Sequence, residues 1–235
     1  MDSVKLLNRT DTKFVMTISQ FEKLLPELNS DYKALEIKEK RSANYKTVYF
    51  DSPEYQYYLD HHNKRPNRYK VRMRSYVDSG LCFFEIKHKY KGRTLKQRIK
   101  IDDFKLDFDH LTNKHLESVI ENAPELKPSI WNEFERITMV NNDRKERLTF
   151  DIGLNFSWEG KNFGYDQIII AEVKQEANDR MAPCIQVFKA NGIRQERISK
   201  YCIGMGILYP NLKSNNFKSK FLTLNKLQDN VGIHF

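Results

Sequence analysis

The chain has 235 residues, of which 40% are hydrophobic, 12% aromatic and 30% charged. This apolar fraction is large enough to form a buried core, which excludes an intrinsically disordered chain. The formal net charge is +9, and residues 61–101 contain thirteen Lys and Arg but only two acidic residues. A positive field confined to one segment indicates a polyanionic partner such as nucleic acid, an anionic membrane or a phosphate chain.

Cysteine, histidine and hydropathy patterns indicate neither a metal cluster nor a membrane segment. Cys82, Cys184 and Cys202 have no CxxC spacing, and the six histidines form no HxH or HExxH motif. Residues 1–14 lack the apolar core of a secretory signal, and no run approaches the ~20 apolar residues of a membrane span. We therefore expect a cytoplasmic protein without a membrane span.

The chain begins with a predicted strand and helix. Residues 9–16 alternate as a short strand, and Thr17 starts a helix whose apolar residues recur at helical spacing to about residue 29. Pro26 predicts that this helix is short or kinked. Residues 45–51 alternate and are aromatic, which favours a second strand, and a further helix is expected to begin with the Ser-Pro pair of segment 52–62.

The basic segment 68–100 predicts three consecutive strands. Residues two apart in a strand share a face, so its charges gather on one face while the opposite face is apolar or aromatic. Turns at 78–80 and 91–93 indicate an antiparallel meander. The charged face consists of Arg68, Lys70, Arg72, Arg74, Glu85, Lys87, Lys89, Lys96, Arg98 and Lys100.

The second half of the chain mixes helices and strands. With about eight strands, four or five helices and no internal repeat or linker, we expect one α+β domain over residues 1–235, built mostly on antiparallel sheet. The expected elements are a helix at 109–122, strands at 131–140, 145–152 and 167–174, a helix at 184–192 and a weakly amphipathic stretch at 215–227.

If the predicted sheet closes into a barrel, its charged faces converge on one lumen. Two charges ~4 Å apart interact by ~4 kcal/mol at an effective dielectric of 20, so an empty lumen would be strongly repulsive. A single cationic strand is more often a solvated face, and edge lysines also prevent aggregation. Three cationic strands in succession favour anion binding. Glu172 is then either a metal ligand or an ion-pair partner of Lys174.

Short motifs follow one another in a fixed order over nearly the whole chain. After Arg9 and Lys13 come TVYFDS (47–52), NRYKVRMRSY (67–76), FFEIKHK (83–89), KQRIK (96–100), ERLTFD (146–151), AEVK (171–174) and SKY (199–201). This ordered set resembles the polyphosphate polymerase domain of the vacuolar transporter chaperone (VTC) family, within the triphosphate tunnel metalloenzyme superfamily.

The resemblance implies an antiparallel β-barrel, a triphosphate tunnel of about eight strands with peripheral helices, that binds ATP and polyphosphate with Mn²⁺ or Mg²⁺. By motif position it implies that Glu172 binds the metal. The implied catalytic residues are Lys13, Arg72, Arg74, Lys87, Arg98, Arg136, Arg147 and Lys200. The implied substrate-binding residues are Arg9, Lys96, Lys174 and Ser199. Lys96 and Arg98 share a face, and either could serve in the KQRIK motif.

The first strand departs from the wider superfamily. Hydrolytic members and related cyclases carry ExExK there, whereas Arg9, Asp11 and Lys13 fill these positions here. Arginine in place of the first glutamate removes a metal ligand and adds phosphate affinity, which disfavours a two-metal triphosphatase. Eukaryotic members also carry an inositol-phosphate-sensing domain and membrane helices, which this sequence lacks. Any coupling to transport would need a membrane protein as a separate partner chain.

The expected function is transfer of the ATP γ-phosphate onto a growing polyphosphate chain. One alternative is a tunnel-type triphosphatase that hydrolyses tripolyphosphate or a nucleoside triphosphate. Another is a non-catalytic module that binds polyphosphate or RNA; DNA is not an expected partner. RNA is disfavoured because the aromatic residues that would stack on bases are predicted to lie mostly on the strand face opposite the cations.

Overall fold

The structure, a computed structural model, describes residues 10–37 and 39–229 of the chain. Within these residues the strands are β1 (Thr10–Thr17), β2 (Tyr32–Ala34), β3 (Ser42–Asp51), β4 (Asn67–Tyr76), β5 (Leu81–Tyr90), β6 (Arg93–Ile101), β7 (Lys127–Asn141), β8 (Glu146–Trp158), β9 (Lys161–Tyr165) and β10 (Ile168–Gln175). The α-helices are α1 (Ile18–Leu28), α2 (Gln56–His62), α3 (His110–Val119), α4 (Pro183–Ala190), α5 (Lys200–Leu208) and α6 (Lys218–Asp229).

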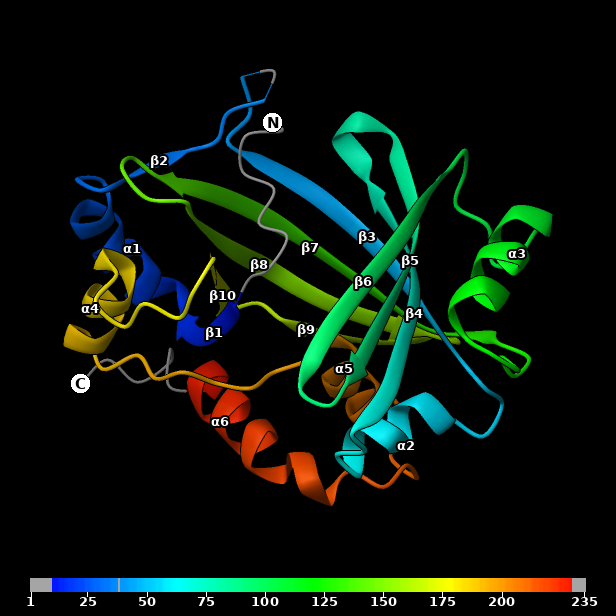
Figure 1. The fold of residues 1–235 in the computed structure, drawn as a ribbon. Helices are drawn as coiled ribbons and strands as arrows, with labels where there is room; N and C mark the ends of the chain where they lie inside the picture. The colour runs from blue at the N-terminus through cyan, green and yellow to red at the C-terminus, as the bar shows by residue number, and fades with distance from the viewer. Residues whose placement is uncertain (1–9, 38, 230–235) are drawn as a thin grey trace.

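All the strands belong to one antiparallel sheet that curls into a half-barrel (Figure 1). Eight strands follow the hydrogen-bonded order β1-β10-β8-β7-β3-β4-β5-β6, while β2 pairs with β7 and β9 pairs with β8. In the described part of the chain, β1 and β6 are the two ends of this order and do not pair with each other. The predicted antiparallel α+β fold is confirmed, as a half-barrel that stays open along one side.

Most of the predicted elements are present, but the sequence patterns missed the short strands β2 and β9 and the helix α5. They also placed the start of α2 too early. Asp51 explains the difference, because its carboxylate accepts hydrogen bonds from the backbone N–H groups of Tyr57 (2.8 Å) and Tyr58 (2.9 Å). The helix therefore begins at Gln56, after Tyr55 has taken a left-handed conformation (φ 58°). No described helix is long and apolar enough to cross a membrane.

The start of α1 is confirmed in detail. Thr17 Oγ1 accepts a hydrogen bond from the backbone N–H of Gln20 (3.1 Å), and the Gln20 side chain accepts one from the backbone N–H of Thr17 (3.0 Å). This reciprocal capping box satisfies two amide groups that the first helical turn leaves unpaired. Pro26 lies within the helix, which ends soon afterwards at Leu28.

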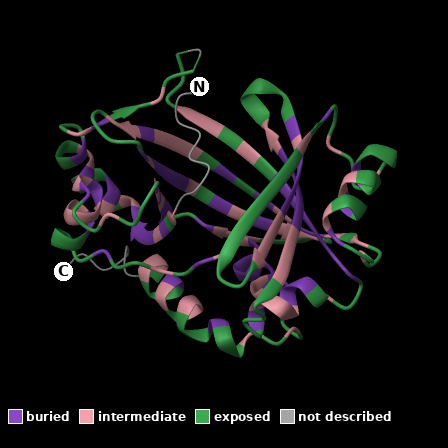
Figure 2. Ribbon diagram, viewed as in Figure 1, coloured by how far each residue is buried: buried purple, intermediate pink, exposed green. Residues whose placement is uncertain are grey.

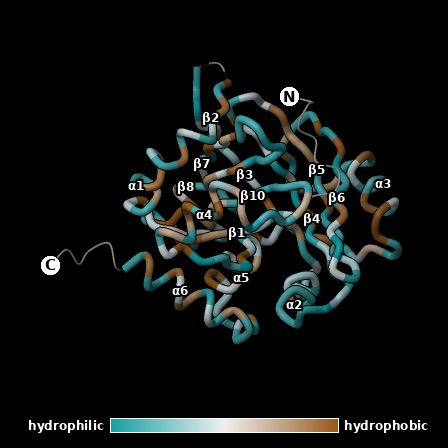
Figure 3. Tube along the Cα trace, turned by 60° about the vertical axis from the view of Figure 1, so that its left-hand side comes forward, coloured by the Kyte–Doolittle hydropathy of each residue, from teal (hydrophilic) through white to brown (hydrophobic). Residues whose placement is uncertain are grey.

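The convex face of the sheet is covered by helices on both sides of the half-barrel. Helices α1 and α4 pack on the outer side of β1, β10 and β8, where Phe14, Phe150 and Phe188 are buried. Helix α3 covers the outer side of the β3–β6 region over Phe84 and Ile86. Hydrophilic and hydrophobic residues alternate along α3 and α6, as expected of helices that bury one side (Figure 3). Because the apolar residues face outward onto helices, the alternate strand positions face the concave side.

Helix α5 lies inside the curve of the sheet, at its lower end (Figure 1). Tyr201, Ile203 and Met205 are buried there against Ile130 and Phe156 of the sheet. Figure 2 shows that buried residues concentrate on the strands of the sheet, whereas β6 and helix α3 are largely exposed. One end of the concave face is thus filled by apolar side chains, which leaves the rest of that face for charged residues.

The close approach of α5 to the sheet requires glycine at position 204. A Cβ atom there would lie 2.5 Å from Ile130 Cδ1 and still closer to Phe156 Cδ1. At Gly206 on the same helix, a Cβ atom would crowd the end of the Phe221 ring, at 2.6 Å, and would lie at ordinary contact distance, 3.4 Å, from Tyr58 Oη. The two glycines therefore differ in what a methyl group would displace.

We expect Gly204→Ala to lower the free energy of unfolding by about 1–3 kcal/mol, the usual cost of overpacking a core. This cost exceeds the helix preference of alanine over glycine, about 1 kcal/mol. Gly206→Ala is the matched control and should be nearly neutral, because the partly buried Phe221 ring can shift. Urea unfolding of both variants checks this. An equal cost at the two positions would contradict the tight packing of α5.

Candidate functional site

The charges of β4, β5 and β6 face the concave side in register. Arg72 lies opposite Glu85, which in turn lies opposite Arg98. The period-two assignment of these three strands is therefore confirmed. Two residues further along each strand, the paired positions are all lysines, with no acidic residue in the row: Lys70, Lys87 and Lys96.

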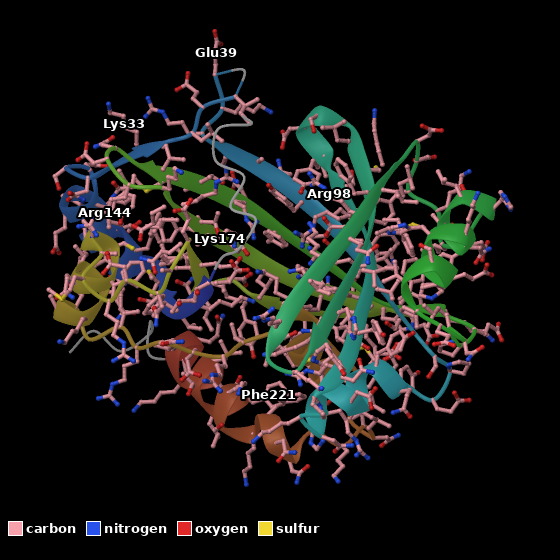
Figure 4. The ribbon with its side chains drawn as sticks, viewed as in Figure 1. Lys33, Glu39, Arg98, Arg144, Lys174 and Phe221 are labelled. Atoms are coloured by element: carbon pink, nitrogen blue, oxygen red, sulfur yellow. The ribbon has the colours of Figure 1, made fainter. Side chains whose placement is uncertain are left out.

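The other wall of the half-barrel also presents charges to the concave side. Lys13 of β1 lies opposite Glu172 of β10, and Lys174 lies between Asp11 of β1 and Arg147 of β8 in the strand register. Figure 4 labels Lys174 and Arg98, which come from opposite ends of the strand order (Figure 4). Residues far apart in sequence are thereby gathered on one surface.

Glu85 is a fully buried carboxylate that holds two cations. Arg72 Nε lies 2.8 Å and Arg72 Nη2 2.5 Å from Glu85 Oε2, and Lys96 pairs with the other carboxylate oxygen. Arg72 Nη1 also donates a hydrogen bond to Tyr49 Oη (3.3 Å). Burial alone would raise the pKa of Glu85, but Arg72, Lys96 and Arg74 outweigh it and hold that pKa below its usual value. Glu85 therefore stays ionised and orients its two partners.

Asp151 has the same role on the opposite wall. Arg136 binds its carboxylate with two hydrogen bonds, Nε to Oδ1 at 2.5 Å and Nη2 to Oδ2 at 2.8 Å, and Lys200 pairs with Oδ2. Burial would raise the pKa of Asp151, yet Arg136 and Lys200 together hold it below the usual range. The two-point Arg contact fixes the guanidinium plane as well as its position.

Aromatic rings on the concave side support several of these cations. The Arg136 guanidinium lies 4.9 Å from the Tyr45 ring centre, Lys200 Nζ lies 4.6 Å from the centre of Phe134, and Arg98 lies 4.5 Å from that of Phe83. Such cation–π contacts favour the charged form of the side chain. The expectation that aromatic residues lie mostly opposite the cations holds on β4 and β5, where Tyr69, Phe84 and His88 lie on the convex side. It fails on β3 and β7, whose Tyr45 and Phe134 lie among the cations.

A second group of cations has no carboxylate partner within the described residues. Arg74, which is 7% exposed, donates only to Thr47 Oγ1 (3.1 Å). Arg147 Nε is buried without a hydrogen-bond partner, and Lys87 makes no ion pair. Burial and then Arg72 lower the pKa of both Arg74 and Lys87, that of Lys87 strongly. These are the positions where a bound anion would relieve repulsion.

The N-terminus of α5 adds two polar groups to this surface. Ser199 caps the helix by accepting a hydrogen bond from the backbone N–H of Cys202 (3.3 Å), and its Oγ also accepts one from Lys70 Nζ (2.8 Å). Lys13 Nζ donates to the carbonyl oxygen of Ile198 (3.1 Å).

Burial lowers the pKa of three lysines of the concave face to about 8: Lys70, Lys96 and Lys200.

The structure brings nearly all of the predicted site residues onto the concave face. Arg9 lies outside the described residues. Arg98 is exposed on the edge strand β6, and it is Lys96 that reaches Glu85. The positions on this surface are Lys13, Arg72, Arg74, Lys87, Lys96, Arg98, Arg136, Arg147, Glu172, Lys174, Ser199 and Lys200. Their roles in binding and catalysis stay predictions.

Sequence reasoning assigned no role to Asp151 or Lys70. Asp151 shares the period-two face of Arg147, which is the signal that could have placed it on the concave side. Its pairing with Arg136 and Lys200, however, depends on the β7–β8 register and on the position of α5. Lys70 belongs to the predicted cationic stripe, but its contact with Ser199 joins residues 129 positions apart.

Glu172 is the only predicted metal ligand. Burial would raise its pKa, but Lys174, whose Nζ lies 2.5 Å from Oε2, and Lys13 and Lys87 hold it well below the usual range. The described residues contain no group of three or more His, Cys, Asp or Glu that could hold a metal ion. A single ionised carboxylate fits Mg²⁺ or Mn²⁺ only when phosphates and water supply the other ligands.

Comparisons with known proteins agree with this fold. The family model of the VTC domain matches residues 8–209. A Hippeastrum protein, HpAC1, described as a candidate adenylyl cyclase with a dominant triphosphatase activity, is similar in structure with a TM-score of 0.52 and 12% identity, over 83% of this chain and 94% of that one. A candidate adenylate cyclase from Vibrio parahaemolyticus gives a TM-score of 0.49 and 12% identity, over 83% and 97%. No curated protein sequence matches the chain.

The lowered lysine pKa values predict proton uptake when a polyanion binds. At pH 8, Lys70, Lys96 and Lys200 are each about half protonated, and a bound anion raises their pKa values. Long-chain polyphosphate, whose interior phosphates do not titrate at this pH, should therefore bind with uptake of about one proton at pH 8 and almost none at pH 6.5. Calorimetry in buffers of different ionisation enthalpy measures this number.

Lys114→Gln, an exposed residue of α3 on the convex side of the sheet, is the control and should leave the proton uptake unchanged, whereas Lys70→Gln should reduce it. Proton release at pH 8, or equal uptake at the two pH values, would show that these lysines do not meet the anion.

Proposed function

Because the chain belongs to the VTC domain family, we propose that it is a polyphosphate polymerase that transfers the γ-phosphate of ATP onto the end of a polyphosphate chain. The observation that carries this proposal is the group of unpaired cations on the concave face, above all Arg74, Lys87 and Arg147. They form no ion pair with any described residue, so they can donate hydrogen bonds to phosphate oxygens without breaking one. Several such positions on one surface suit a ligand with several adjacent phosphates.

The paired cations have a different part in this proposal. Arg72 and Arg136 are fixed by Glu85 and Asp151, so they contribute positive charge at defined positions without reorganising when substrate binds. Preorganised charge of this kind stabilises the transition state of phosphoryl transfer, in which negative charge is spread over the transferred group. The planar guanidinium groups also keep donors for a phosphate in a fixed direction.

The transfer itself needs no covalent intermediate with the protein. A terminal oxygen of the polyphosphate acceptor forms the new bond to the γ-phosphorus of ATP, the bond to the β–γ bridging oxygen breaks, and ADP leaves. The protein's contribution is to align donor and acceptor phosphates and to neutralise their repulsion. In this proposal Lys200, which lies at the N-terminus of α5 and pairs with Asp151, contacts the transferred group.

We propose Glu172 as the residue that holds a Mn²⁺ or Mg²⁺ ion brought in with the substrate. When bound, the ion would neutralise charge on the phosphates of the nucleotide. Glu172 is ionised, and Lys174 orients its carboxylate. Glu85 and Asp151 are each held by an arginine and a lysine, and the described residues contain no group of three or more acidic, His or Cys side chains that could hold a metal. This disfavours a two-metal hydrolytic site and supports transfer to phosphate over transfer to water.

The proposal predicts that the purified protein, given ATP and Mn²⁺, accumulates long-chain polyphosphate and ADP. Arg74→Ala should lower kcat/KM by about 10²–10³, because it removes an unpaired donor from the site. Arg144→Ala is the matched control and should be neutral, because Arg144 is exposed and pairs with Asp179 far from the concave face. Polymer is measured by gel electrophoresis and ADP by a coupled assay.

Orthophosphate without polymer would identify a triphosphatase instead, and polyphosphate binding without turnover would identify a binding module. Either result would contradict the polymerase.

Glu172→Gln should weaken Mn²⁺ binding in the presence of a non-hydrolysable ATP analogue by about tenfold or more, the usual effect of changes even in the residues that only orient a metal ligand. Glu133→Gln is the control, since Glu133 lies on the convex face of the sheet and pairs with Lys46. Electron paramagnetic resonance of free Mn²⁺ reports the binding without requiring activity. Unchanged Mn²⁺ affinity in Glu172→Gln would reject Glu172 as the ligand.

A further inference from the structure

The cationic face of β4 and β5 continues beyond the residues assigned to the site. Arg68 and Lys89 lie opposite each other in the β4–β5 register, two residues past the Lys70 and Lys87 pair. They therefore share the concave face, about 7 Å further along the strands. None of the predicted catalytic or binding residues occupies this position.

Arg68 carries an unsatisfied donor. Its Nη1 donates a hydrogen bond to the carbonyl oxygen of Arg65, which orients the guanidinium, while its Nε is buried and has no hydrogen-bond partner. A buried donor without a partner costs free energy that an incoming acceptor can recover. Arg68 Nε can therefore donate a hydrogen bond to an oxygen atom of a bound ligand.

A third cation approaches from the segment between α4 and α5. Arg197 is exposed and lies two residues before Ser199, the residue that contacts Lys70. Burial, then Arg68 and then Arg197 lower the pKa of Lys89, so the three cations are close enough to repel one another. No carboxylate forms an ion pair with any of the three in the described part of the chain.

We propose that Arg68, Lys89 and Arg197 form an outer row that binds the phosphates of a polyphosphate chain where the chain leaves the site. This inference rests on the proposed function, because it takes the growing chain as the ligand. The outer row continues the lysines at 70 and 87, while α5 fills the neighbouring part of the same end with apolar side chains. The cations of β4 and β5 thus form a continuous charged surface along which the polyphosphate chain can bind.

The chemistry of the outer row favours polyphosphate over single-stranded RNA. RNA-binding surfaces place aromatic rings among the cations so that bases can stack. Here Tyr69 and His88 stack on each other, with ring centres 4.3 Å apart, but they occupy the alternate strand positions and so face the convex side. The outer row offers charge without a stacking surface, which suits a ligand made of phosphate alone.

The test compares a triple variant, Arg68→Gln with Lys89→Gln and Arg197→Gln, with a control triple of equal charge change, Lys23→Gln with Lys114→Gln and Lys226→Gln. The control residues are exposed and lie elsewhere on the surface. Affinities for long-chain polyphosphate and for tripolyphosphate are measured at several salt concentrations without ATP.

We expect the outer-row variant to bind long-chain polyphosphate about tenfold more weakly, with a salt dependence reduced by about two in log–log slope. Its affinity for tripolyphosphate should not change, because a ligand of three phosphates can be bound by the candidate site residues without reaching the outer row. The control triple should behave as the unmodified protein. If the Arg68 change impairs folding, the double variant of Lys89 and Arg197 should show a smaller shift in the same direction.

The proposal would be overturned if the outer-row variant lost as much affinity for tripolyphosphate as for long-chain polyphosphate. It would also be overturned if the variant lost no affinity for long-chain polyphosphate. Equal loss for a poly(U) RNA of matched length would also overturn it, because the surface would then be a general polyanion site. Binding is measured without turnover, so these results are separate from the failure of the polymerase proposal, which is a lack of polymer made from ATP by the unmodified protein. In an active protein, the outer-row variant should make shorter chains at an unchanged initial rate.

Discussion

Repulsion among like charges on the concave face is the constraint on which the rest of the structure depends. Unit charges 4 Å apart interact by about 4 kcal/mol at an effective dielectric of 20, so the cations could not be gathered without compensation. Glu85 and Asp151 supply it, each holding one arginine and one lysine. Because only some of the cations are compensated, the surface divides into positions that are fixed and positions that remain available to a phosphate.

The apolar core and the charged surface are joined through tyrosine residues. Tyr201 of α5 donates a hydrogen bond to Asp51, which also caps α2, and its ring lies 5.0 Å from that of Tyr49. Tyr49 in turn accepts a hydrogen bond from Arg72. The packing of α5 in the curve of the sheet therefore sets the position of Lys200 as well as the environment of Arg72. Core packing and site geometry depend on one another.

Period-two patterns predicted which strand residues face the concave side, because each strand has one face on an apolar layer and one on the charged surface. They could not identify the partners of Glu85 and Asp151, since these depend on strand register and on a helix distant in sequence. Helix α5 was not predicted from the sequence, because it is buried on nearly all sides and its sequence therefore shows no polar stripe. The inward aromatic rings at 45, 49 and 134 were missed because alternation alone does not reveal cation–π contacts.

The balance of charge on the concave face bears on the type of reaction. A hydrolase must release small phosphate products at each turnover, and many uncompensated cations would slow that release by stabilising the bound product. A polymerase gains from the same property, because a chain that stays bound presents its end for the next transfer. The free energy that Arg74, Lys87 and Arg147 contribute on binding phosphate would thus favour a reaction in which the product is also the next substrate, as in the proposed polymerase. On this argument the cations that form no ion pair within the described residues, more than Glu172, support the proposal of chain growth over hydrolysis.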